Sequence, residues 1–159
     1  DRRLYWQREL IRRLPTPEPV ELLACDYDGQ HYIDAVRGLA REPEGGARCT
    51  VCFRLRLEET ARQARAHGFD YFGTTLTVSP HKDAQRLNAI GAELAQQYGV
   101  RWLPSDFKKR EGYKRSIELS KQYGLSVELL RQQLPPLRLR HDLKLTAAQA
   151  VVVDSAKHK

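Results

Sequence analysis

Segments with helical periodicity alternate with short apolar segments along the middle of the chain. Apolar residues recur at helical intervals over residues 50–68 and 87–98, and runs rich in β-branched or aromatic residues follow at 70–78 and 100–103. Helices of ten or more residues between short strands predict βαβ crossovers, because a crossover helix usually links parallel strands. The sequence therefore predicts an α/β domain with a mostly parallel sheet and helices on both of its faces.

Weaker patterns flank this central alternation. They predict a buried strand at 20–25 and helices at 4–14, 31–39 and 112–123. In the last helix, Ile117 and Leu119 are expected to face inward. Residues 126–159 fit the alternation poorly, apart from a short helix or strand at 147–153. We therefore predict one domain over residues 1–125 and an atypical tail over 126–159.

The composition excludes several classes of protein. No apolar run approaches the ~20 residues of a membrane helix, and no charged-then-apolar leader opens the sequence. Three cysteines are too few for a secreted disulfide scaffold, so a cytoplasmic setting is expected. The formal net charge of +7 favours a polyanionic partner such as nucleic acid. The densest basic cluster is Lys108, Lys109, Arg110, Lys114 and Arg115, which could contact phosphates or form a solvated helix start.

Cys49 and Cys52 form a CxxC pair. Two thiolates at this spacing can hold zinc, take part in an iron–sulfur site or exchange as a redox disulfide, and a purely structural pair is the remaining option. The pair follows a glycine-containing loop and opens a predicted helix, whose N-terminus favours thiolate over thiol. Arg48 adds a positive charge beside it. Two thiolates do not complete a tetrahedral site, and the other candidate ligands are Cys25, Asp26, Asp28, His31, His67 and His81.

Hydroxyl groups and a cation gather in the segment from Gly73 to Lys82. The segment lies at the carboxyl end of a predicted parallel strand, where open α/β sheets bind ligands. A threonine-rich strand followed by a capped helix would show the same residues. The sequence contains no GxGxxG, GxxxxGK[ST] or GxSxG motif, which excludes the usual dinucleotide, P-loop and hydrolase sites.

A long ordered series of short segments carries a resemblance to one family. The series is GARCTVCF (46–53), RLEETA (56–61), HGFD (67–70), FGTTL (72–76), SPHK (79–82), IG (90–91), YGV (98–100), DFKK (106–109), GY (112–113), ELSK (118–121) and YGL (123–125). Together these segments resemble the QueH-type epoxyqueuosine reductases over about residues 1–125. This ordered series is far more specific than the CxxC pair alone.

The resemblance implies an incomplete Rossmann-type α/β fold of the HUP or PP-loop kind. It also implies an iron–sulfur oxidoreductase that reduces epoxyqueuosine to queuosine in tRNA, the last step of queuosine biosynthesis. Cys49 and Cys52 match the family's CxxC and are carried over as metal ligands. The implied cofactor is a [4Fe–4S] cluster, with or without a further iron. The implied partners are tRNA carrying epoxyqueuosine and an unidentified electron donor, with no membrane.

Other site residues are assigned less directly. Thr74, Thr75, Ser79 and Lys82 match the family's strand-end motif and are expected to line the substrate site. Lys108, Lys109 and Arg110 are candidates for contact with the tRNA backbone because of their charge. The resemblance assigns no catalytic residue.

The sequence departs from the family pattern at both ends. The family's N-terminal Cys-Cys pair and its C-terminal Cys-Gly-Cys segment are not present, so the expectation is a fragment with at least half of the metal-binding thiols missing. Activity of the fragment alone is therefore not implied. Codons for residues 125–132 can be chosen so that a one-base shift yields Tyr-Arg-x-Asn-Tyr-Cys-Gly, close to the missing segment. A frameshifted or disordered tail over 126–159 is one hypothesis that follows.

Two other kinds of function are compatible with the same residues. The chain could be a non-catalytic metal-binding or RNA-binding module that keeps the scaffold, or a thiol redox protein that uses its CxxC pair. Metal-independent cycling between thiols and a disulfide would favour the redox protein.

Overall fold

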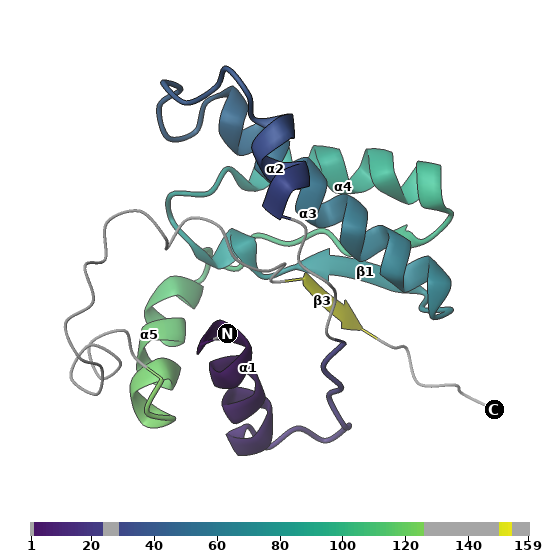
Figure 1. The fold of residues 1–159 in the computed structure, drawn as a ribbon. Coiled ribbons are helices and arrows are strands. Elements are labelled where there is room, and N and C mark those ends of the chain that lie inside the picture. The colour runs from purple at the N-terminus through teal and green to yellow at the C-terminus, as the bar shows by residue number, and fades with distance from the viewer. Residues whose placement is uncertain (1, 24–28, 126–149, 154–159) are drawn as a thin grey trace. The chain divides into compact units, whose positions relative to one another are not determined.

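The computed structural model describes residues 2–23, 29–125 and 150–153 (Figure 1). The chain divides into two compact units. The described residues of the first are 2–23 and 114–125, and those of the second are 29–113 and 150–153. In the described part of the chain, no helix combines the length and the apolar character that crossing a membrane requires.

The described helices of the first unit are α1 (Arg2–Arg13) and most of α5 (Gly112–Gln122). The guanidinium of Arg13 donates a hydrogen bond of 2.9 Å to the backbone carbonyl of Tyr123, which ties the end of α1 to the residue after α5. These helices confirm the predictions for 4–14 and 112–123. The inward orientation predicted for Ile117 is wrong, because its side chain is 41% exposed.

The second unit contains most of the secondary structure. Its elements are α2 (Gly29–Ala35), α3 (Ala47–Ala66), β1 (Tyr71–Thr74), the 3-10 helix η1 (Leu76–Val78), α4 (Ala84–Tyr98), β2 (Arg101–Trp102) and β3 (Ala150–Val153). The sheet has the order β2-β1-β3. Figure 1 shows α3 and α4 side by side above it, and they pack against each other.

The sheet combines both strand directions. β1 and β2 are parallel, with Tyr71 opposite Arg101 and Phe72 opposite Trp102, and α4 is the crossover between them. β3 is antiparallel to β1 and agrees with the strand option for 147–153. The coarse α/β prediction is therefore confirmed, whereas among the described strands only the β1–β2 pair is parallel.

The core lies between α3, α4 and the sheet. α3 contributes Phe53, Leu57, Ala61 and Ala64, and α4 contributes Leu87, Ile90 and Leu94. Both sets follow helical spacing, so one face of each helix is apolar. Phe72 of β1 is fully buried, and its ring meets Trp102 edge-on at 5.0 Å between centroids. This packing fixes the start of α3 and the ends of β1 and β2 on one scaffold.

The strand predicted over 70–78 is wrong in its second half, because β1 ends at Thr74 and η1 follows. The hydroxyl oxygen of Thr74 accepts a hydrogen bond of 3.2 Å from the backbone N–H of Leu76. A threonine hydroxyl that binds the backbone two residues on competes with sheet pairing and turns the chain. The β-branched composition that predicted a strand therefore supports a turn here.

Two other element predictions need correction. The helix predicted at 31–39 is α2, which ends at Ala35, and turns follow it. Residues 20–23 form no strand, and 24–25 lie outside the described residues, as does most of the predicted tail. Val20 and Leu23 are exposed, so the apolar run at 20–23 lacks the packing partners that would make it a buried strand.

Candidate functional site

Cys49 and Cys52 lie in the first two turns of α3, three residues apart. Residues at this spacing share one face of a helix, so both sulfurs are presented on the same side. Both thiols are free and half-buried, and Cys49 packs against the core. The sulfur of Cys49 accepts a hydrogen bond of 3.3 Å from the backbone N–H of Gly45. The helix start therefore holds a thiol pair in a fixed position, as the sequence predicts.

The loop before α3 shapes the surroundings of this pair. Gly46 is the N-cap but has no side chain to accept a hydrogen bond, and the carboxylate of Glu42 accepts one from the backbone N–H of Ala47 at 2.9 Å instead. The guanidinium of Arg48 donates to the hydroxyl of Tyr32 at 3.4 Å. This hydrogen bond is the main reason that the pKa of Arg48 is raised, and the neighbouring thiols add to the effect. Arg48 therefore keeps a positive charge beside the thiol pair.

The predicted strand-end residues lie at the carboxyl end of β1. Thr74 is buried, and its hydroxyl is committed to the backbone of Leu76. Thr75 is half-buried at the start of η1, where its side chain makes no capping hydrogen bond. Ser79 is half-buried, and its carbonyl accepts the backbone N–H of Lys82 at 3.2 Å. Thr74, Thr75, Ser79 and Lys82 therefore all lie between the last residue of β1 and the start of α4.

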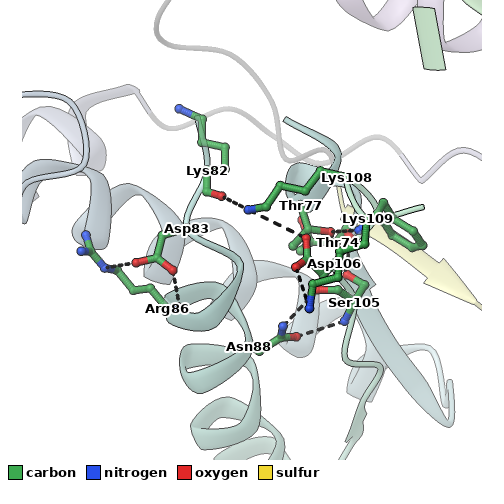
Figure 2. Close-up of polar contacts among 11 residues, drawn as sticks. Thr74, Thr77, Lys82, Asp83, Arg86, Asn88, Ser105, Asp106, Lys108 and Lys109 are labelled. Carbon is green, nitrogen blue, oxygen red and sulfur yellow. Dashed lines mark hydrogen bonds and ion pairs between the residues drawn. The ribbon is translucent and has the colours of Figure 1, made fainter. Parts of the chain in front are cut away.

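A second group of polar residues follows β2, at the same edge of the sheet (Figure 2). The hydroxyl groups of Ser105 and Thr77 form a hydrogen bond of 3.0 Å, and the Ser105 hydroxyl also reaches the carbonyl of Thr74 at 3.3 Å. Asn88 of α4 holds Ser105 through two hydrogen bonds to its backbone. The ends of the two parallel strands are thus joined by side chains, at the edge where open α/β sheets bind ligands.

The basic residues 108–110 lie in the turn between β2 and α5. The ammonium group of Lys108 donates to the carbonyl of Lys82 at 2.9 Å and lies 3.8 Å from the carboxylate of Asp106 (Figure 2). Lys109 and Arg110 are exposed, and Arg110 has a left-handed backbone with φ 51. The structure therefore brings Lys108 to the strand-end segment and leaves Lys109 and Arg110 at the surface.

Two cross-links join the loop before α3 and the first turn of α3 to neighbouring segments, one to Lys82 of the strand-end segment and one to Arg86 at the start of α4. The ammonium group of Lys82 pairs with the carboxylate of Glu44 at 3.0 Å. The guanidinium of Arg86 donates to the carbonyl of Gly45 at 2.6 Å and to the hydroxyl of Thr50 at 3.1 Å. The site residues predicted from separate parts of the sequence therefore belong to one connected region of the second unit.

Of the further metal ligands considered from the sequence, the three histidines belong to the described residues, and none of them is grouped with the cysteines as a metal site. His31, His67 and His81 are exposed, and Cys25, Asp26 and Asp28 lie outside the described residues. Across residues 2–23, 29–125 and 150–153, no three side chains of His, Cys, Asp or Glu are grouped as a metal site. The described chain therefore supplies two thiols, which suit a soft metal centre, as part of a ligand set.

Sequence reasoning missed Arg86, Asn88 and Ser105 as parts of this region, and it gave Thr77, which lies within the segment from Gly73 to Lys82, no role of its own. Ser105 could have been found, because it comes two residues after the strand predicted at 100–103. Arg86 gave no signal, because its partners Gly45 and Thr50 lie 41 and 36 residues away in the sequence. Asn88 resembled any polar residue of an amphipathic helix.

The described fold and site define an α/β domain with a thiol pair at a helix start, beside the polar ends of two parallel strands. A family model described as Epoxyqueuosine reductase QueH matches residues 1–133. The chain belongs to this family, which confirms the resemblance seen in the sequence.

Several curated relatives carry the same name, Epoxyqueuosine reductase QueH. The relative from Streptococcus pyogenes serotype M1 is 44% identical over 126 residues, which are 78% of this chain and 49% of the relative. The relative from Staphylococcus epidermidis is 45% identical over 112 residues, or 69% of this chain and 47% of the relative. The relative from Thermotoga maritima is 38% identical over 94 residues, which are 59% of this chain and 49% of the relative. The chain spans about half the length of the curated relatives it matches.

Proposed function

We propose that the protein acts as an epoxyqueuosine reductase, which reduces epoxyqueuosine to queuosine in tRNA. The observation that carries the proposal is the CxxC pair at the start of α3 in a chain of this family, where Glu44 of the preceding loop pairs with Lys82 of the strand-end segment. The proposed fold of the whole domain is a Rossmann-type sheet of the HUP or PP-loop kind, with β1, α4 and β2 as one βαβ unit. The proposed setting is the cytoplasm.

Cys49 and Cys52 are the proposed ligands of an iron-containing centre, a [4Fe–4S] cluster with or without a further iron. The donor set fits, because both thiols are free, half-buried and on one helix face. The backbone N–H of Gly45 already donates to the sulfur of Cys49, as hydrogen bonds do around ligand sulfurs. The remaining ligands would come from residues outside the described part. Such a centre, when bound, would supply electrons and a Lewis acid for the epoxide oxygen.

The residues of this chain would bind and orient the substrate beside that centre. Removal of an epoxide oxygen consumes two electrons and two protons and releases water, so an external electron donor is required. Thr75 and Ser79 place hydroxyl groups at the strand end, where they can bind the hydroxyl groups of a sugar-like substrate. Thr74 serves to turn the chain, because its hydroxyl is committed to Leu76. Lys82 provides a cation at the same place.

The tRNA backbone is the proposed partner of the exposed basic turn. Lys109 and Arg110 present their charges to solvent, where they can neutralise phosphates. Lys108 holds the turn against the carbonyl of Lys82. The basic cluster therefore has an outer part that suits contact with tRNA and an inner residue that shapes the site.

The test uses the full-length gene product, reconstituted anaerobically with iron and sulfide and assayed on tRNA that carries epoxyqueuosine. We expect visible cluster absorbance and queuosine formation. Cys49→Ser and Cys52→Ser should each lose both, whereas Arg65→Gln, at the far end of α3, should keep both. Absence of absorbance and of queuosine in the unsubstituted protein would overturn the proposal. Metal or RNA binding without turnover would indicate a binding module, and metal-free disulfide cycling would indicate a thiol redox protein.

A further inference from the structure

We infer that Arg86 is the positioning residue of the CxxC pair, because it fixes the loop and helix start that carry Cys49 and Cys52 onto the start of α4. This inference rests on the proposed function only in taking the cysteines as the metal ligands. Arg86 acts on the thiols indirectly, through the backbone of Gly45 and the side chain of Thr50.

Three acceptors surround the guanidinium of Arg86. Its Nη1 atom donates to the carbonyl of Gly45 at 2.6 Å and to the hydroxyl of Thr50 at 3.1 Å. Its Nε atom lies 3.5 Å from the carboxylate of Asp83. Asp83 is the N-cap of α4 and also accepts the backbone N–H of Arg86. The guanidinium is therefore oriented by Asp83 at the start of α4, and it forms hydrogen bonds with Gly45 and Thr50 on either side of Cys49.

Gly45 links Arg86 to the thiol of Cys49 through two hydrogen bonds. Its carbonyl accepts from Arg86, and its backbone N–H donates to the sulfur of Cys49 at 3.3 Å. The backbone of Gly45 has φ +86, a left-handed conformation that glycine adopts without strain. Glycine can also leave this conformation easily, because it has no side chain to restrict it. Arg86 removes this freedom by anchoring the carbonyl. The N–H donor is thereby kept in line with the sulfur.

Thr50 links Arg86 to the first turn of α3. It lies between the two cysteines on the first turns of α3, and its hydroxyl accepts from Arg86. Gly46 offers no side-chain cap, and the Glu42 carboxylate binds the N–H of Ala47 in its place, so the first turn of α3 is stabilised by neighbouring groups, of which Arg86 is one. A second cross-link, between Lys82 and Glu44, joins the same segments, but Glu44 is largely exposed. Exposed pairs of this kind contribute little, so Arg86 makes the main polar connection between the start of α4 and the segment from Gly45 to Thr50.

Arg65 provides a matched control. Its guanidinium donates to the backbone carbonyl of Tyr98 at 2.7 Å, which links α3 to α4 at the opposite end of the helix pair. Arg65→Gln therefore removes the same kind of contact between the same helices, away from the cysteines. A general loosening of the helix pair would affect both variants, whereas a positioning role predicts an effect of Arg86 alone.

The experiment measures thiol reactivity in the full-length gene product, reduced and free of iron. Trypsin cleaves after Arg48 and Arg54, so one peptide, residues 49–54, reports on both cysteines. Time-resolved alkylation followed by mass spectrometry gives the rate for that peptide. We expect Arg86→Gln to accelerate alkylation about threefold to tenfold, as the loss of one or two hydrogen bonds allows. Arg86→Lys should restore part of the protection, because an ammonium group can still donate to the Gly45 carbonyl.

The outcomes separate the inference from the proposed function. Equal alkylation rates in Arg86→Gln and Arg65→Gln would overturn the positioning role. If Arg86→Gln does not fold, Thr50→Val decides instead: it removes one acceptor of Arg86, and an unchanged rate there would overturn the role. The reconstituted protein gives a second readout, because Arg86→Gln should lose iron to a chelator faster than Arg65→Gln. A parent protein that takes up no iron would defeat the proposed function and leave the thiol comparison intact.

Discussion

The indole N–H of Trp102 donates a hydrogen bond of 3.0 Å to the side-chain oxygen of Asn88. The same oxygen accepts the backbone N–H of Ser105 at 3.1 Å, and the side-chain nitrogen of Asn88 donates to the carbonyl of Ser105 at 3.0 Å. One amide on α4 therefore fixes both β2 and the loop that follows it. That loop carries Ser105 to its contact with Thr77, so the polar edge of the sheet depends on Asn88.

Asn88→Leu should lower the free energy of unfolding by about 2–3 kcal/mol. The substitution leaves the Trp102 indole and both backbone groups of Ser105 without their partner, and unsatisfied groups cost more than a hydrogen bond contributes. Urea denaturation followed by tryptophan fluorescence measures the change. Gln97→Leu, at an exposed position of the same helix, should change stability by no more than about 0.5 kcal/mol. Equal stability of the two variants would contradict the role given to Asn88.

Gly91→Ala should destabilise the protein although alanine favours helices. A Cβ atom at Gly91 would lie 2.3 Å from ring atoms of Trp102, so the indole or the helix must move. Overpacking of this kind costs about 1–3 kcal/mol, which exceeds the helix preference of alanine, at most about 1 kcal/mol. Thermal or urea unfolding measures it. In a Trp102→Val background the cost of Gly91→Ala should fall, and an unchanged cost there would show that the indole is not the obstacle.

Local patterns predicted the elements that depend on local contacts. The CxxC pair at a helix start follows from a glycine-containing loop and the helical periodicity of 50–68, and α3 begins there. The strand predicted at 70–78 failed because its threonines form hydrogen bonds: Thr74 turns the chain, and Thr77 binds Ser105, 28 residues away. Arg86 likewise acquires its role only when distant segments meet. Secondary-structure propensity is a property of single residues, whereas the polar edge of this sheet is made by hydrogen bonds between residues far apart in the sequence.

Lys109 and Arg110 should contribute more to tRNA affinity than Lys108. Lys108 is 30% exposed and bound to the Lys82 carbonyl near Asp106, whereas Lys109 is 77% exposed. Lys109 also lies 3.4 Å from the carboxylate of Asp106, but exposed ion pairs of this kind are weak. Lys109→Gln and Arg110→Gln should each reduce the slope of log affinity against log salt by about 1, since each removes one phosphate contact.

Fluorescence anisotropy with labelled tRNA, at several salt concentrations, measures these slopes in the full-length gene product. Lys108→Gln should change the slope by less than half as much, because its ammonium group is bound to the carbonyl of Lys82 and its side chain is only 30% exposed. Arg65→Gln should leave the slope unchanged. A slope change for Lys108→Gln as large as that for Lys109→Gln would contradict the division of the cluster into an inner and an outer part.

Tyr98 should lose its proton at higher pH than an ordinary tyrosine. Its hydroxyl donates a hydrogen bond of 2.9 Å to the carboxylate of Glu58, which joins the end of α4 to α3. This hydrogen bond raises the pKa of Tyr98 above its usual 10.0, and partial burial adds to the rise. Because the folded-state pKa is raised, the stabilisation is fully present below pH 10.0 and is lost as the pH rises through the folded-state value.

Glu58→Gln should therefore bring the pKa of Tyr98 back toward its ordinary value, since a neutral amide no longer favours the protonated hydroxyl. Tyrosinate absorbance during a pH titration measures this, and Tyr98→Phe identifies which component belongs to Tyr98. A Tyr98 component that titrates at the same pH with and without the Glu58 carboxylate would contradict the hydrogen bond as the cause.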